Sequence, residues 1–149
     1  MKKIITCIVI ANRTRARFYF NDGPNRGLEG RPDLDMEGEN LHARDIQADQ
    51  PGRVFDRSGK GRHAMEYPSD PQRLIERKFL GDVTDRLDKL SQEASFDRLV
   101  LVAPPRVLGE LRKLLSKSLG RKVHGEINKD LTHISQHDLP GHFDDVIVL

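Results

Sequence analysis

The sequence predicts a mixed α/β domain, in which helices pack on a β-sheet that opens with a β-hairpin. Two apolar segments near the N-terminus are separated only by a short polar turn, as in a hairpin. A continuous apolar run follows later, flanked by two segments with apolar residues at three- and four-residue spacing. Because the chain has 149 residues, 36% of them hydrophobic and 32% charged, it is most simply a single domain with one core.

The predicted hairpin occupies residues 4–20. Residues 4–11 are apolar and β-branched and predict a buried strand, residues 12–15 a polar turn, and residues 16–20 a returning strand. Two lysines precede the first strand, as in a signal peptide, but this segment lacks a small-residue cleavage site and is shorter than the roughly 20 residues that cross a bilayer. We therefore expect a cytoplasmic protein without membrane attachment.

Cys7 is the single cysteine and is predicted to be a small apolar residue of the first strand. No disulfide within the chain and no thiolate-bound metal cluster is possible with one cysteine. The fold is therefore expected to need neither an oxidising compartment nor a metal.

The charge changes sign between the hairpin and the first helix. Residues 22–49 contain eight acidic side chains and three arginines, which predicts a solvated connection with one short strand. Residues 50–64 predict a glycine-rich basic loop that is mobile until it meets a partner. Its basic side chains are those of Arg53, Arg57, Lys60, Arg62 and His63.

A long amphipathic helix is predicted to begin at Ser69, Asp70 and Pro71, which combine N-cap candidates with an early proline. Apolar residues then recur at helical spacing as far as Ala94. Gly81 lies inside this pattern, where glycine costs about 1 kcal/mol relative to alanine, so we expect close packing or a slight bend there.

The second half of the chain predicts a strand, a helix and another strand. Residues 98–103 are apolar without alternation, which predicts a central, parallel strand buried on both faces. Residues 107–119 predict one helix that Gly120 terminates, and residues 122–127 predict the next strand. The right-handed crossover makes the sheet mixed. The apolar residues 146–149 predict an edge strand or a contact with a partner.

Four segments together resemble a bacterial family: residues 11–18 (ANRTRARF), 51–64 (PGRVFDRSGKGRHA), 96–105 (FDRLVLVAPP) and 129–133 (KDLTH). Their order and spacing resemble the family named "protein required for attachment to host cells" over nearly the whole chain. That family is similar to the middle domain of archaeal and eukaryotic peptide release factors and of the Pelota ribosome-rescue proteins. The resemblance implies an RNase H-like mixed sheet and association with RNA or the ribosome.

The release factors also suggest a test for catalysis. Their Gly-Gly-Gln triplet precedes a long helix and enters the ribosomal centre where the peptidyl-tRNA ester is hydrolysed. The matching position here is Gly61-Arg62-His63, which keeps only the first glycine and has no glutamine. The hydrolytic role is therefore not carried over. Hydrolysis of the peptidyl-tRNA ester with His63 in place of glutamine is a third functional alternative, after RNA binding and protein interaction.

The basic loop predicts binding of RNA or the ribosome through the five side chains named above. Arginine and lysine release condensed counterions when they meet phosphates, and glycines let backbone amides approach closely. The alternative is a solvated loop, or one that pairs with the preceding acidic segment. A second basic surface would also suit rRNA, or would be the solvated side of a helix. It consists of Arg106, Arg112, Lys113, Lys117, Arg121 and Lys122.

Candidates for catalysis are few. Asp130 and His133 would form an acid/base pair beside a ligand, whereas the structural alternative is that Asp130 caps the local backbone. The first strand contains no carboxylate, which argues against a two-metal nuclease. Neither a GxSxG elbow nor a GxxxxGK[ST] loop is present in the sequence.

Histidines near the C-terminus suggest a metal site, but their spacing argues against it. Pro140-Gly141 disrupts any helical arrangement before His142. No metal or other cofactor is therefore predicted. The residues considered are His133, His137, Asp138 and His142.

The prediction is thus a noncatalytic RNA- or ribosome-associated factor. The alternative is a protein-interaction module required indirectly for attachment to host cells, with the apolar terminus and the acidic segment as its binding surface.

Overall fold

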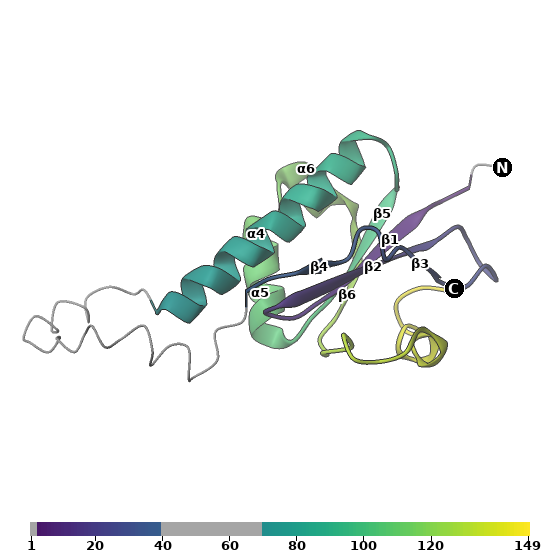
Figure 1. Cartoon of the computed structure of the whole chain (residues 1–149). Helices are drawn as coiled ribbons and strands as arrows, with labels where there is room; N and C mark the ends of the chain where they lie inside the picture. Colours follow the sequence, from purple (N-terminus) through teal and green to yellow (C-terminus); the bar gives the residue numbers. More distant parts are fainter. Residues whose placement is uncertain (1–2, 40–69) are drawn as a thin grey trace, which may run out of the picture.

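The computed structural model describes residues 3–39 and 70–149. Figure 1 shows one twisted sheet with helices on one face and the C-terminal segment on the other. The basic loop predicted at residues 50–64 lies outside the described residues, as do Arg53, Arg57, Lys60, Arg62 and His63. The elements are β1 (Thr6–Ala11), β2 (Arg15–Asn21), β3 (Glu29–Gly30), β4 (Met36–Glu37), α4 (Pro71–Gln92), β5 (Arg98–Val102), α5 (Pro105–Leu114), α6 (Lys117–Lys122), β6 (Val123–Ile127), and the 3-10 turns η2 (Gln136–Asp138) and η3 (Pro140–His142).

The sheet is mixed, as predicted. Its strands lie in the order β3-β2-β1-β5-β6, with β4 pairing beside β3 on β2. β1 and β2 form the antiparallel hairpin, in which Ala11 is opposite Ala16. β5 lies parallel to β1 on one side and to β6 on the other, so the predicted central parallel position of this strand is confirmed. An antiparallel meander followed by parallel strands is the expected RNase H-like arrangement.

Both faces of the central strands are buried, which explains why their sequences do not alternate between apolar and polar. Odd-numbered residues such as Cys7, Val9 and Leu99 contact the helices and belong to one core cluster. Even-numbered residues such as Ile8 and Val100 belong to a second cluster under the C-terminal segment. Cys7 is fully buried, as predicted, and burial raises the pKa of its thiol. The two clusters form cores above and below one sheet.

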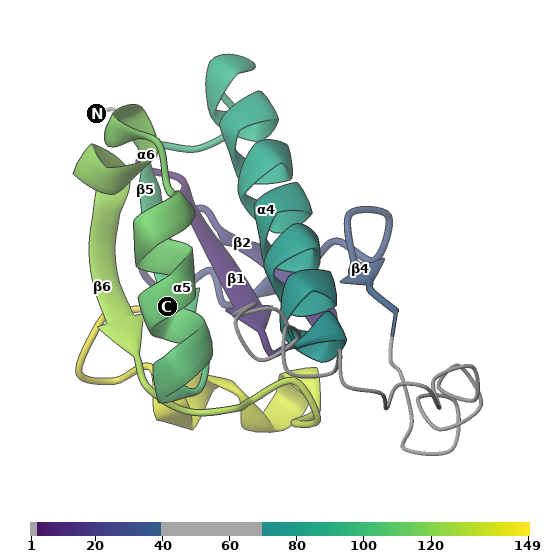
Figure 2. The ribbon, with the colours of Figure 1, turned by 90° about the vertical axis from the view of Figure 1, so that its left-hand side faces the viewer.

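α4 crosses the sheet face beside α5 (Figure 2), and Asp70 is its N-cap, accepting a hydrogen bond from the Gln72 N–H at 3.0 Å. Its buried stripe includes Phe79, Val83 and Leu87. The prediction that Gly81 is closely packed is wrong, because a Cβ added there would meet no atom of the described chain within 4 Å.

Three further sequence predictions need correction. The helix predicted at residues 107–119 is two helices, because Ser116 has an extended backbone and caps α6 by accepting the Leu119 N–H at 3.1 Å. Gly120 therefore lies inside α6. The described part of the acidic connection, up to residue 39, contains two short strands, β3 and β4, rather than one.

The C-terminal segment at residues 146–149 is not the predicted edge strand. Ile147 instead packs into the second core cluster, and the Leu149 carbonyl accepts a hydrogen bond from the Asn25 N–H at 2.6 Å. None of the helices within residues 3–39 and 70–149 has the length and apolar character to span a membrane.

Two glycine substitutions are predicted to change stability in opposite directions. Gly81→Ala should raise the free energy of unfolding by about 1 kcal/mol, because the site has room for a methyl group and alanine favours helix.

Gly38→Ala should lower the free energy of unfolding by about 1–3 kcal/mol, because the Cβ of the new alanine would lie 2.7 Å from Phe79 Cδ1 in the core. Urea denaturation followed by circular dichroism measures both, and a destabilised Gly81→Ala variant would contradict this account.

Candidate functional site

The carboxyl ends of the parallel strands β1, β5 and β6 meet at one edge of the sheet. Open α/β sheets bind ligands at this edge, because loops from several strands converge there. Here the loops after the three strands line an open pocket of about 420 Å³. Its lining residues are Asn12, Arg13, Thr14, Pro104, Arg106, Val107 and Asp130.

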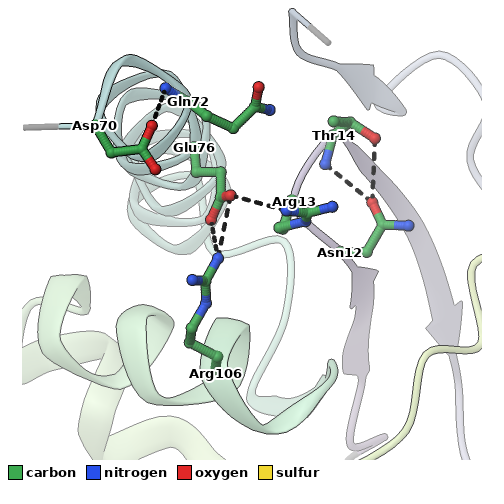
Figure 3. Close-up of polar contacts among 7 residues, drawn as sticks. All are labelled: Asn12, Arg13, Thr14, Asp70, Gln72, Glu76 and Arg106. Atoms are coloured by element: carbon green, nitrogen blue, oxygen red, sulfur yellow. Dashed lines mark hydrogen bonds and ion pairs between the residues drawn. The ribbon is translucent and has the colours of Figure 1, made fainter. Parts of the chain in front are cut away.

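One buried carboxylate joins the elements around this pocket. Glu76 projects from the first turns of α4 and is only 7% exposed. Arg106 of α5 donates from Nη2 to both carboxylate oxygens of Glu76, at 2.7 and 3.1 Å. Arg13, in the turn between β1 and β2, donates from Nη1 to Oε2 at 3.3 Å (Figure 3). Two guanidinium groups therefore share one carboxylate, and the cluster carries one net positive charge.

Both arginines remain open to solvent. The side chain of Arg13 is 55% exposed and that of Arg106 is 52% exposed. Glu76 occupies Nη1 of Arg13 and Nη2 of Arg106, and among the described residues no other acceptor is hydrogen-bonded to either guanidinium. Each group keeps N–H donors that a ligand can use.

α5 begins at the same pocket and adds to its positive character. Its N-cap is Pro104, whose side chain cannot accept a hydrogen bond from the first turn. The exposed amides of a helix N-terminus carry a partial positive charge. The field of α5 therefore acts in the same direction as the two arginines.

A hydrogen-bonded network holds the β1–β2 turn against the segment after β6. Asn12 Oδ1 accepts from the backbone N–H groups of Thr14 and Arg15, at 3.0 and 2.9 Å. Asn12 Nδ2 donates to Thr132 Oγ1 at 3.0 Å and to Asp130 Oδ2 at 3.4 Å. The turn that carries Arg13 is thereby fixed to the loop that carries Asp130.

Asp130 is a local capping residue, as the structural alternative predicted. Its Oδ1 accepts from the Thr132 N–H at 3.0 Å and from Thr132 Oγ1 at 2.6 Å. Burial opposes ionisation of this carboxyl, but the hydrogen bonds from Thr132 and Asn12 outweigh it and hold the pKa of Asp130 below its ordinary value. His133 is exposed, and no hydrogen bond joins it to Asp130 in the described structure.

The remaining candidate residues do not line this pocket. His137 and Asp138 belong to η2 and His142 to η3. Within the described ranges, no three histidine, cysteine or acidic side chains are grouped so that they could hold a metal ion.

Four members of the second basic surface are engaged within the protein. Arg112 donates to both carboxylate oxygens of Glu126, which holds the pKa of that carboxyl below its ordinary value. Lys113 lies 4.0 Å from Glu110, and Lys122 donates to Ser91 Oγ at 2.6 Å. Arg106 belongs to the Glu76 cluster. Lys117 and Arg121 are exposed.

Sequence reasoning did not identify Glu76 or assign a role to Arg13. A signal for Glu76 was present, because it lies three residues before Phe79 and seven before Val83 and is therefore in phase with the buried stripe of α4. An acidic residue on a buried stripe needs a cationic partner, since burying an unpaired charge is costly. That partner lies in another element, which the sequence does not reveal.

Comparison with known proteins was made at the level of sequence and of fold. No curated protein sequence matches the chain significantly. Among solved structures, the chain is similar to the crystal structure of an archaeal translation termination factor, aRF1, with a TM-score of 0.48 and 11% identity over 95% of this chain. The chain spans 37% of that protein. The predicted remote similarity to a release factor is thus found.

The profile of one protein family matches residues 7–143. This range contains all four segments on which the resemblance was based, including residues 51–64, which lie outside the described residues. The chain therefore belongs to the family described as "Protein required for attachment to host cells".

Proposed function

We propose that this protein is a noncatalytic, cytoplasmic factor that binds RNA, free or within the ribosome, at the carboxyl edge of its parallel strands. The cationic segment containing Arg53, Arg57, Lys60 and Arg62, with His63, contacts the phosphodiester backbone. The observation that supports this most directly is that Arg13 and Arg106, both exposed, lie at the edge near which the described chain stops at Glu39 and resumes at Asp70.

The chain before the segment is anchored at this edge. β4 pairs with β2 so that Glu37 is opposite Arg15, immediately after the turn that carries Arg13. The Gly38 N–H then donates to the Thr14 carbonyl at 2.8 Å. Glu39, the last described residue before the segment, therefore comes one residue after a contact with Thr14, which lines the pocket.

The chain after the segment is anchored there too. Asp70 caps α4, and Glu76 on the next turns of that helix holds Arg13 and Arg106. The described residues just before residue 40 and just after residue 69 thus both lie near the edge that presents Arg13 and Arg106.

The physical mechanism is local electrostatic attraction. Lysine and arginine that contact phosphates release condensed counterions, which supplies most of the affinity for nucleic acid. The net charge of the whole chain is only +2, so the attraction depends on where the cations lie and not on their total number.

RNA binding should depend on the segment and weaken with salt. Replacing Arg53, Arg57, Lys60 and Arg62 together by alanine should lower affinity for a fluorescent oligouridine and make the slope of log affinity against log salt shallower by up to about 3, if each cation contacts one phosphate of a single strand. Fluorescence anisotropy from 50 to 200 mM salt gives both values. The matched control replaces four exposed cations elsewhere, Lys3, Arg26, Lys78 and Lys89. Equal losses in the two variants would contradict the assignment to this segment.

Association with ribosomes is predicted to follow the same pattern. The protein should co-sediment with ribosomes at low salt, and less of it should do so at high salt, because the contacts are made to phosphates. The variant without the four segment cations should leave the ribosomal fractions, whereas the matched control should stay. Absence of the unmodified protein from ribosomal fractions at both salt concentrations would count against the ribosome as the target.

A second candidate function is a protein-interaction module, favoured by apolar side chains at the opposite edge of the sheet. Ile4 is 47% exposed and Val148 is 68% exposed. Both line an open pocket of about 580 Å³ at the amino ends of the parallel strands. This function predicts no salt-sensitive RNA binding. A double variant, Ile4→Ser with Val148→Ser, would then abolish partner binding.

A further inference from the structure

The pocket at the carboxyl edge carries charges of both signs. Arg13 and Arg106 line it, and so does Asp130. A simple anion would be attracted by the two guanidiniums and repelled by the carboxylate. A ligand that joins an anionic group to a hydrogen-bond donor would be favoured by all three residues.

The guanidiniums are held ready for an anion. Glu76 is buried and fixes one nitrogen of each arginine, at 2.7 Å for Arg106 and 3.3 Å for Arg13. Arginine side chains lose conformational entropy when they order on a ligand, and groups already held in place lose less. The N–H donors left over suit phosphate oxygens, which arginine binds in a fork.

The carboxylate of Asp130 is held ready for a donor. Its Oδ1 already accepts two hydrogen bonds from Thr132. Its Oδ2 accepts only a long bond of 3.4 Å from Asn12 in the described structure, so this oxygen has capacity for another donor. Hydrogen bonds from Thr132 and Asn12 overcome the burial that opposes ionisation and lower the pKa of Asp130, so the group is a charged acceptor at neutral pH.

We propose that this pocket binds one nucleotide step of RNA, with the phosphodiester on Arg13 and Arg106 and the neighbouring ribose 2′-hydroxyl donating to Asp130 Oδ2. The inference rests on the proposed function and adds a basis for choosing RNA over DNA. The 2′-hydroxyl is the group by which a protein distinguishes the two. The pocket, with a volume of about 420 Å³, is open to solvent, so it does not enclose the nucleotide step.

The test compares a fluorescent ten-residue oligouridine with the oligodeoxyuridine of the same length, by anisotropy with the full chain at pH 7. The RNA should bind about tenfold more tightly, because a hydrogen bond to a charged acceptor contributes more than one between neutral groups. Asp130→Asn keeps the side-chain shape and should reduce this ratio to about 1–3, because a neutral amide oxygen is a weaker acceptor. DNA affinity should stay or rise, since a repulsive charge has been removed.

Two controls separate this inference from the proposed function. Asp85→Asn removes the same charge from an exposed position on α4 and should leave the ratio unchanged. Arg106→Lys keeps the charge but loses the fork and should weaken RNA and DNA to similar degrees; thermal unfolding of each variant verifies that it is folded. Equal binding of RNA and DNA, or a ratio that Asp130→Asn does not change, would overturn the inference and leave RNA binding intact. Binding of neither oligomer would overturn the proposed function itself.

Discussion

The way in which α4, α5 and the β1–β2 turn meet depends on one buried carboxylate, that of Glu76. Glu76 lies where α4 approaches the hairpin turn and α5, and a buried charge is tolerated only when opposite charges and hydrogen bonds satisfy it. Arg13 and Arg106 supply both and are thereby held at the same carboxylate (Figure 3). Loss of either arginine would leave the carboxylate poorly compensated. The interaction that fixes three elements to each other therefore also determines where the positive charge of this edge lies.

The sheet can support such an edge because both of its faces are covered. Helices bury one face, and the other is buried by a C-terminal segment that contains only short 3-10 turns. That segment packs closely on β6: a Cβ at Gly125 would collide with Val146 Cγ1. Leu131, four residues after the end of β6, belongs to the same core cluster. Since Asp130 precedes this buried leucine, the packing of the second face holds the carboxylate at the pocket.

The elements that could be predicted from sequence were those in which a pattern of buried apolar residues extends over several positions. Residues 98–102 show it best: absence of alternation predicted burial on both faces, and β5 has parallel neighbours on both sides. Features decided by a single contact were missed. Leu111 and Leu119 continue one apolar stripe, but Ser116 between them interrupts the helix through a cap and a hydrogen bond to Asp88 at 2.8 Å. Likewise, apolar residues at 146–149 do not distinguish a strand from coil packed on a sheet.

The site could be predicted only in part, because the number of cations in a sequence does not show which of them are neutralised. Arg106 and Arg112 belong to the same helix and were assigned to the same basic surface. Arg112 has a carboxylate of its own in Glu126, so that pair is neutral, whereas Arg106 shares Glu76 with an arginine 93 positions away in the chain. One positive charge therefore remains in the cluster of Glu76, Arg13 and Arg106, and none at the Arg112 pair. An anion that approaches this part of the molecule gains more at the strand ends than on the solvent face of α5.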